Sequence, residues 1–192
     1  QSRSSAASDV YKRQGQPCTY PDSLVGQAGY HMGDMACSIG QHTWNAAVWS
    51  AHAATHAAAL VLEGERATYA LCRPPGHHAY ADRANGFTYL NNAAIAAQYL
   101  RRQHPRVAIL DVDVHHGNGT QGIFWRRSDV LTLSLHGDPH FCTPFFTGHA
   151  HERGEGEGLG YNLNYPLARG TGTDDYPVSY THLRAHETKA NL

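Results

Sequence analysis

The sequence predicts an α/β fold built on a parallel β-sheet. Two short apolar segments, residues 107–115 and 130–136, are rich in Val, Ile and Leu and are typical of buried strands. Segments with a helical pattern precede the first strand and separate the two. Strands and helices that alternate in this way favour a parallel sheet covered by helices.

The first predicted element is a helix over residues 44–63, with Thr43 able to cap its start and Gly64 its end. Residues 15–42, which are rich in glycine, aspartate and proline, precede it as a predicted loop region. The helix is expected to bury the face that carries Trp44, Val48, Ala51, Ala58 and Leu62.

A short buried strand is predicted at residues 68–72, because Pro74 and Pro75 break the pattern soon after it. A second helix follows, with Asn91 or Asn92 as its cap and Pro105 beyond its end. The remaining elements are strands at residues 107–115, 130–136 and 161–167, with a short helix at residues 121–124 between the first two.

Both ends of the chain match translated adapters of the kind used in sequencing libraries. The segments are "SSAASDVYKRQ" at residues 4–14 and "PVSYTHLRAHET" at residues 177–188. We therefore expect residues 1–14 and 177–192 not to be native, and residues 15–176 to be part of a longer domain, truncated at both ends. The alternative is a genuine polar tail at each end.

Composition narrows the class of protein. The chain has 192 residues, 41% of them hydrophobic, and a net charge of -1, which suits one soluble globular domain and gives no basic surface for nucleic acid. No apolar run approaches the roughly 20 residues that span a bilayer, and no signal peptide is recognisable. The four cysteines are dispersed, so we expect a reducing, cytoplasmic location. The 15 histidines favour a metal site.

The segment "VAILDVDVHHGNGT", residues 107–120, places charged groups in a predicted buried strand. Asp111, Asp113 and His115 share one face of that strand. Two neighbouring buried carboxylates cost several kcal/mol unless a cation or donors compensate them. A divalent metal bound by Asp113 and His115 would do so. The alternative is that the aspartates cap backbone amides while His116 is simply packed.

A second histidine pair favours the metal interpretation. His77 and His78 in "RPPGHHA" follow the predicted strand at residues 68–72. Because ligands collect beyond the carboxyl ends of parallel strands, these imidazoles can reach the same rim as Asp113 and His115.

Five motifs together resemble the zinc-dependent histone deacetylase family, and most closely its bacterial acetylpolyamine amidohydrolase branch. They are "RPPGHHA", "GFTYLNNAAIAA", "ILDVDVHHGNGTQ", "LTLSLHGDP" and "PFFTGHAHERGEGEG", in the family's order and at about its spacing. The resemblance implies the three-layer arginase/deacetylase fold with its parallel sheet, and hydrolysis of an N-acetyl amide. Residues 15–176 would then be a partial deacetylase catalytic domain.

The resemblance also implies roles for individual residues. It places one zinc ion on Asp113 and His115, and it places Asp111 behind His77 and Asn118 behind His78. It implies that His78 acts as general base, while His77 is the more cationic and stabilises the oxyanion. The walls of the acyl-lysine channel would be Gly86, Phe87 and Phe146, although each phenylalanine could instead be a core residue. Monovalent-cation sites of a kind that K⁺ would fill would involve Asp111, Asp113, His115, Ser134 and Leu135, and also Phe124, Arg127, Val130 and Tyr161.

The sequence also departs from the family pattern. The third zinc ligand, an aspartate, and the tyrosine that polarises the acetyl carbonyl are not identified, because Asp174 and Asp175 lack the family's context and Tyr180 lies in the adapter-like end. Three further positions, Asn85, Thr88 and His151, carry residues that are less common in the family.

We therefore expect a zinc amidohydrolase that acts on acetylated polyamines or similar small amines. The full-length protein is expected to be able to form a homodimer, and this truncated chain is expected to be inactive. Acetyl-lysine in proteins is the alternative substrate. A non-catalytic remnant is the alternative of another class, and a dimanganese ureohydrolase is disfavoured because "HHGNGT" offers no bridging carboxylate. Asp22 and Asp34 are expected to be solvated surface acids rather than contacts for a polyamine.

Overall fold

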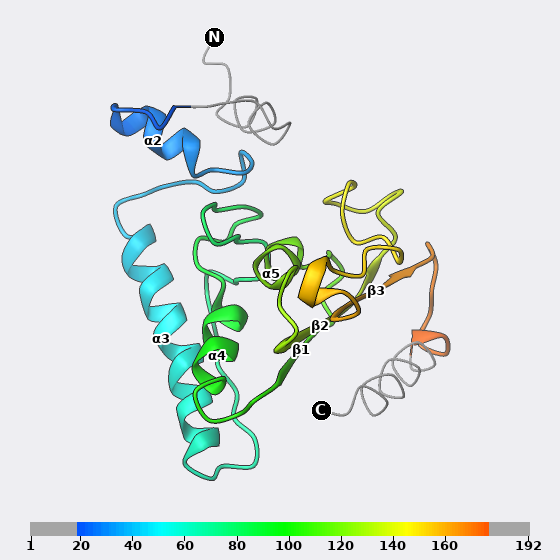
Figure 1. Cartoon of the computed structure of the whole chain (residues 1–192). Coiled ribbons are helices and arrows are strands. Elements are labelled where there is room, and N and C mark those ends of the chain that lie inside the picture. The colour runs from blue at the N-terminus through cyan, green and yellow to red at the C-terminus, as the bar shows by residue number, and fades with distance from the viewer. Residues whose placement is uncertain (1–18, 177–192) are drawn as a thin grey trace. The chain divides into compact units, whose positions relative to one another are not determined.

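The computed structural model describes residues 19–176, in two compact units that divide after Ala96 (Figure 1). The adapter-like ends at residues 1–14 and 177–192 lie outside the described residues, and their assignment stays a prediction. Among the described helices, none is long and apolar enough to cross a membrane.

The first unit contains two helices, α2 (Leu24–Tyr30) and α3 (Thr43–Leu62), and the start of a third, α4 (Asn92–Leu100). The prediction of a loop throughout residues 15–42 is wrong at α2. Ser23 caps this helix by accepting a hydrogen bond from the Gly26 N–H at 3.1 Å. No residue of α2 is buried, so the helix has no apolar face that periodicity could reveal.

The bounds predicted for α3 are nearly correct, but the predicted buried face is only partly so. Ala58 is buried, while Val48, Ala51 and Leu62 are half-buried. Trp44 is 65% exposed, and the buried residues are Ala47, Ser50, Ala54 and Ala58. Small side chains face inward because the segments that carry Pro74 and Asn92 lie close to this side of the helix. The Ser50 hydroxyl donates to the carbonyl of Pro74 at 2.7 Å and accepts from Asn92 Nδ2 at 2.9 Å.

Capping is confirmed for α4 and for the end of α3, and contradicted for the start of α3. Gly64, with φ +117°, directly follows the C-cap residue of the helix and donates its N–H to the carbonyl of Val61 at 3.1 Å. The Asn91 side chain accepts a hydrogen bond from the Ala94 N–H at 3.0 Å, as expected of a helix cap. Thr43 is instead the first residue of α3, where its hydroxyl accepts from the Gly40 N–H at 2.8 Å. The cap position belongs to His42, which makes no side-chain capping bond.

The buried strand predicted at residues 68–72 is wrong. This segment has no strand assignment in its unit, and Tyr69 and Leu71 are 87% and 83% exposed. A strand needs a hydrogen-bonded neighbour, and the described residues of the first unit form only isolated bridges, Met32 with Ala84 and Asn85 with Thr88.

The second unit confirms the predicted α/β fold and parallel sheet. Its strands are β1 (Val107–Asp111), β2 (Val130–Gly137) and β3 (Asn162–Leu167), hydrogen-bonded in the order β1-β2-β3, with both pairs parallel. Helix α5 (Asn118–Phe124) connects β1 to β2 and packs against β2, and the short 3-10 helix η1 (Gly156–Gly158) precedes β3. The core of the unit consists of Leu131, Leu133 and Leu135.

Two element boundaries differ from the sequence prediction. Strand β1 ends at Asp111, four residues before the predicted end, so Asp113 and His115 are not strand residues. Helix α5 begins three residues earlier than predicted, at Asn118. The first difference lengthens the irregular turn between β1 and α5 and the second shortens it. The turn comprises residues 112–117 and carries Asp113 and His115.

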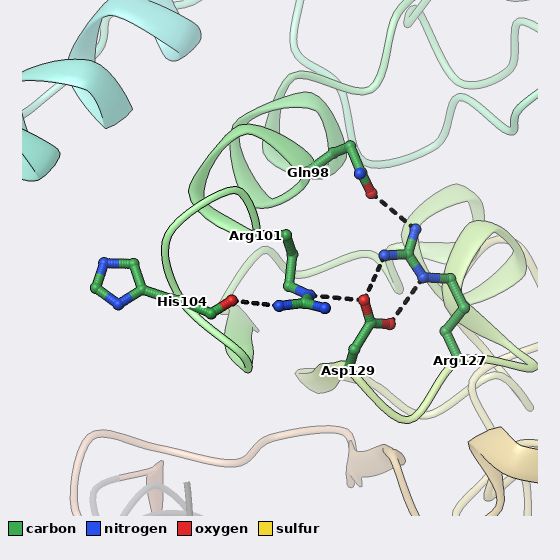
Figure 2. A network of polar contacts seen from close by, with 5 residues as sticks. All are labelled: Gln98, Arg101, His104, Arg127 and Asp129. Carbon is green, nitrogen blue, oxygen red and sulfur yellow. Dashed lines mark hydrogen bonds and ion pairs between the residues drawn. The ribbon is translucent and has the colours of Figure 1, made fainter.

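A charged network joins the end of α4 to the loop before β2 (Figure 2). Asp129 accepts hydrogen bonds from Arg101 Nε at 2.6 Å, from Arg127 Nε at 2.9 Å and from Arg127 Nη2 at 2.7 Å. Arg127 also donates to Gln98 Oε1 at 2.9 Å, and Arg101 donates to the carbonyl of His104. The hydrogen bonds from Arg127 hold the pKa of the Asp129 carboxyl well below its ordinary value, with smaller help from Arg101 and against the effect of burial.

Candidate active site

The turn after β1 is built by two successive bonds from backbone to carboxylate. The Asp113 N–H donates to Asp111 Oδ1 at 3.0 Å, and the His115 N–H donates to Asp113 Oδ1 at 2.8 Å. The aspartates therefore do cap backbone amides, as one of the two interpretations predicted. Each carboxylate keeps further lone pairs, so this capping is compatible with metal binding.

Asp113 and His115 are spaced as two ligands of one metal ion would be. Asp113 Oδ1 lies 3.3 Å from His115 Nδ1, and the two side chains are 50% and 44% exposed. Zinc binds oxygen and nitrogen at about 2.0–2.2 Å in tetrahedral geometry, which separates neighbouring ligand atoms by roughly 3.3–3.5 Å. Among the described residues, however, no three His, Cys, Asp or Glu side chains are grouped to hold a metal. The pair fits two of the positions around an ion, and a third ligand is needed.

A small cavity lies between α5 and the three strands β1, β2 and β3. It measures about 10 Å³, close to the room that one water molecule requires. Asp111 and Ser134, which are partners in the parallel register, both line it. This places two of the residues predicted to bind a monovalent cation side by side.

The hydrogen bond between Ser134 and His136 leaves the hydroxyl oxygen of Ser134 suited to face a cation. Ser134 Oγ lies 2.7 Å from Nδ1 of His136, and His136 Nε2 donates to the carbonyl of Gly148 at 2.8 Å. Burial lowers the pKa of His136, which keeps its ring neutral. With its hydrogen on Nε2, that ring accepts the Ser134 hydroxyl proton at Nδ1, and the lone pairs of the hydroxyl oxygen are left available.

The second predicted cation set surrounds the end of α5. Phe124 is buried, and its carbonyl accepts a hydrogen bond from the Arg127 N–H at 2.9 Å. The carbonyl of Tyr161 accepts a hydrogen bond from the Thr132 N–H at 2.9 Å, and the Thr132 hydroxyl oxygen lies 3.3 Å from it. These carbonyls are already occupied in part, and binding of a cation to this set stays a prediction.

In the first unit, the tandem histidines lie together and against a glycine turn. The rings of His77 and His78 have centroids 4.0 Å apart. Gly86, at φ +54°, lies so close that a Cβ on it would sit 2.6 Å from Cγ of His78. Two backbone hydrogen bonds between Asn85 and Thr88 close this turn and leave Phe87, with φ 64°, at its tip.

Asp34 is not the solvated surface acid that the sequence predicted. It is half-buried, and its Oδ2 accepts a hydrogen bond from the Gly86 N–H at 2.8 Å. Its Oδ1 accepts from the Ala36 N–H at 2.9 Å. Asp34 therefore holds the turn that packs against His78, whereas Asp22 is exposed as expected.

Neither candidate wall phenylalanine is a core residue. Phe87 is 68% exposed in the first unit and Phe146 is 63% exposed in the second. This excludes core packing for both. The predicted pairings of His77 with Asp111 and of His78 with Asn118 join residues from different units, and they stay predictions.

Sequence reasoning missed a buried polar layer in the second unit. Gln121, Asn162 and Asn164 are all less than a tenth exposed, and their amide groups interconnect with Glu152. The signal was present, because two asparagines at alternate positions of a predicted strand point to the same side of the sheet.

Comparisons with known proteins agree with these findings. The histone deacetylase domain family matches residues 4–187. An acetylpolyamine amidohydrolase of Burkholderia pseudomallei (strain 1710b) is 54% identical over 169 residues, which are 86% of this chain and 48% of the relative. One from Mycoplana ramosa is 49% identical over 79% of this chain and 45% of its own length.

Solved structures show the same similarity. The crystal structure of acetylpolyamine aminohydrolase from Burkholderia pseudomallei superposes with a TM-score of 0.86 at 44% identity, over 97% of this chain and 59% of that one. An HDAC homologue complexed with SAHA superposes with a TM-score of 0.76 at 28% identity, over 98% of this chain and 49% of that one. The chain spans about half the length of the curated relatives it matches. It belongs to the histone deacetylase domain family, whose members depend on a metal, typically zinc.

Proposed function

We propose that the complete protein is a zinc-dependent amidohydrolase that removes acetyl groups from acetylated polyamines or similar aminoalkyl amides. One observation carries the proposal: the Asp113–His115 pair has the spacing of two zinc ligands and lies in the turn directly after parallel strand β1. The identity of more than half of the aligned residues with acetylpolyamine amidohydrolases supports the choice of substrate.

Asp113 and His115 would hold the zinc ion together with a third ligand outside the pair. When bound, the metal would supply Lewis acidity and lower the pKa of a coordinated water toward roughly 7. The half-exposure of both side chains leaves a face of the pair open to solvent and substrate.

His78 would act as the general base and would later protonate the leaving amine. Its half-buried ring is seated against the backbone of Gly86, which limits its rotation. An uncharged partner, Asn118, would orient the ring without raising its pKa as a carboxylate does. His77 with Asp111 behind it would be the more cationic of the two, and would stabilise the negative charge that develops on the acetyl oxygen.

Phe87 and Phe146 would line the path of the aminoalkyl chain. Both rings are exposed on turns. Phe87, and Phe145 directly before Phe146, have positive φ angles of 64° and 59°, which are uncommon for bulky residues. Strained backbone and exposed aromatic rings are typical of ligand sites rather than of structural turns. Methylene groups of a substrate would bury well between such rings.

The test is release of acetate by the full-length protein, loaded with zinc, from a monoacetylated diamine and from an acetyl-lysine peptide. We expect faster release from the diamine, loss of activity with a zinc chelator, and recovery when zinc is added. Asp113→Ala and His115→Ala should each lower both zinc content and activity. The matched control is Asp82→Ala, since Asp82 is 69% exposed and belongs to none of the five motifs.

Three outcomes separate the alternatives. Faster release from the peptide would favour a protein-lysine deacetylase. Zinc binding without acetate release from either substrate would favour a non-catalytic protein. Unchanged zinc content in both ligand variants would contradict the assignment of the metal to Asp113 and His115.

A further inference from the structure

We propose that Glu152 is a positioning residue that holds Phe146 in place as a wall of the substrate channel. The role of Phe146 in this inference depends on the proposed function, but the packing of the loop that carries Phe146 does not. Glu152, Phe146 and the turn after β1 that carries His115 all belong to the second unit.

The carboxylate of Glu152 collects donors from three separate parts of the unit. Its Oε2 accepts hydrogen bonds from Gln121 Nε2 of α5 at 2.7 Å, from the Gly148 N–H at 2.8 Å and from Asn164 Nδ2 of β3 at 3.3 Å. One oxygen thus ties the segment after Phe146 to a helix and to a strand.

The amides around Glu152 form a connected buried layer. Asn162 Nδ2 donates to Gln121 Oε1 at 2.9 Å and to the carbonyl of Glu152 at 2.8 Å, and Asn164 Nδ2 donates to Gln121 Oε1 at 2.8 Å. The Thr132 hydroxyl donates to Asn162 Oδ1 at 2.6 Å. A satisfied polar network of this kind is rigid, because each bond restricts the geometry of the next.

Two buried histidines fix the residues that directly follow Phe146. His116 Nδ1 lies 3.2 Å from Thr147 Oγ1, and His136 Nε2 donates to the carbonyl of Gly148 at 2.8 Å. Gly148, at φ +100°, allows this approach, because a Cβ on it would lie 2.6 Å from His136 Nε2. Since His116 follows His115 in the chain, the same contacts tie the wall to the predicted metal ligand.

The residues that precede Phe146 are also held against the turn after β1. Cys142 Sγ lies 3.7 Å from the carbonyl of Val114, and the Gly137 N–H donates to the same carbonyl at 2.9 Å. Phe146 therefore projects from a loop that is anchored before and after it, while its own ring is exposed. Glu152 supplies the charged anchor, and hydrogen bonds to an ionised acceptor are roughly twice as strong as neutral ones.

The test compares Glu152→Ala and Glu152→Gln with Glu155→Ala in the full-length protein. Glu155 is the matched control, because it lies in the same segment but is exposed and pairs with Arg126 at 3.0 Å. For the acetylated diamine we expect KM to rise about tenfold in Glu152→Ala and about threefold in Glu152→Gln, with kcat within about twofold. This is the pattern of binding lost equally in the ground state and the transition state, as expected for a wall that contacts the aminoalkyl chain. Glu155→Ala should change neither constant.

A double-mutant cycle tests whether the effect passes through Phe146. If Glu152 acts by holding this ring, Glu152→Ala should raise KM little further in a Phe146→Ala background. Additive effects on KM would overturn the proposal, because Glu152 would then act independently of the wall.

Hydrogen exchange keeps the inference testable if the protein proves not to be a deacetylase. We expect faster exchange in peptides that cover residues 138–150 of Glu152→Ala, with unchanged exchange in β2 and no change in Glu155→Ala. Unchanged exchange at residues 138–150, or equally faster exchange in β2, would overturn the local anchoring role. Absence of acetate release from the unmodified protein would refute the proposed function but not this result.

Discussion

At the residue scale, the position of Gly86 shows how closely the backbone encloses a candidate catalytic histidine. A side chain at this position would collide with the His78 ring, and the positive φ already disfavours any residue with a Cβ. Gly64 also has a positive φ, +117°, but open space surrounds it. A comparison of substitutions at these two glycines therefore distinguishes the effect of backbone strain from the effect of contact with the His78 ring.

Gly86→Ala should lower both stability and activity, whereas Gly64→Ala should lower stability alone. Each substitution imposes backbone strain of about 1 kcal/mol. Only Gly86→Ala also displaces the His78 ring, so we expect kcat to fall at least about tenfold in this variant. Thermal unfolding and acetate release by the full-length protein measure the two effects. Equal activity in the two variants would show that the contact with His78 is unimportant for catalysis.

The tandem histidines should contribute unequally to turnover. A general base typically contributes about 10²–10⁴-fold to rate, so His78→Ala should lower kcat more than His77→Ala. The measurement is kcat of both variants in the zinc-loaded full-length protein, with His56→Ala on the exposed side of α3 as control. Equal losses would refute this division of roles.

At the scale of elements, Asp129 joins α4 to the start of β2 (Figure 2). Its carboxylate takes three hydrogen bonds from two guanidinium groups, and its side chain is 28% exposed. The residue precedes Val130, the first residue of β2, and the Val107 N–H at the start of β1 donates to its carbonyl at 3.1 Å. Its side chain and backbone therefore fix where the parallel pair begins.

Asp129→Asn should lower the free energy of unfolding by about 1–2 kcal/mol at neutral pH, allowing for the partial exposure of the network. Chemical denaturation of the full-length protein measures the loss, with Asp82→Asn as the exposed control. A loss equal to that of the control would show that the network adds nothing measurable to stability.

The same substitution predicts a dependence on pH. Because the pKa of Asp129 is lowered by folding, its stabilising contribution is complete above its ordinary value of 3.8 and is lost as pH falls through the folded value. The difference between unmodified protein and Asp129→Asn should therefore be constant from pH 7 to about pH 5 and shrink in stronger acid. A difference that grows on acidification would contradict this assignment.

At the scale of the whole molecule, the described part of the second unit exposes apolar side chains beside its sheet. Leu110, Val112 and Val114 are 39%, 55% and 63% exposed. Among the described strands, β1 and β3 each pair on one side only. Apolar groups next to an unpaired strand edge are typical sites of self-association.

The 192-residue chain expressed alone should therefore self-associate, and its apparent mass in light scattering should rise with concentration. Val112→Lys should reduce this association, because a charge beside a strand edge opposes edge-to-edge pairing. Tyr69→Lys, in the first unit, is the control for added charge. A monodisperse monomer across concentrations would show that the exposed groups are harmless.

The sequence alone determined the alternation of helices and strands, the parallel sheet, an asparagine cap at Asn91 or Asn92 and the family motifs. These follow from local properties, namely periodicity, capping chemistry and the order of residue types along the chain. The same local reasoning failed for part of the buried face of α3 and for residues 68–72, because burial depends on neighbours that are distant in sequence.

Only the tertiary structure decided where β1 ends, that Asp34 and Glu152 are internal anchors, and that Phe87 and Phe146 face outward. Each of these depends on a donor or a surface contributed by another segment, such as the Gly86 N–H for Asp34 or Asn164 of β3 for Glu152. The sequence does not show whether the carboxylate of an aspartate or glutamate is solvated or accepts hydrogen bonds from the protein. Its role is set by the groups that folding brings within hydrogen-bonding distance.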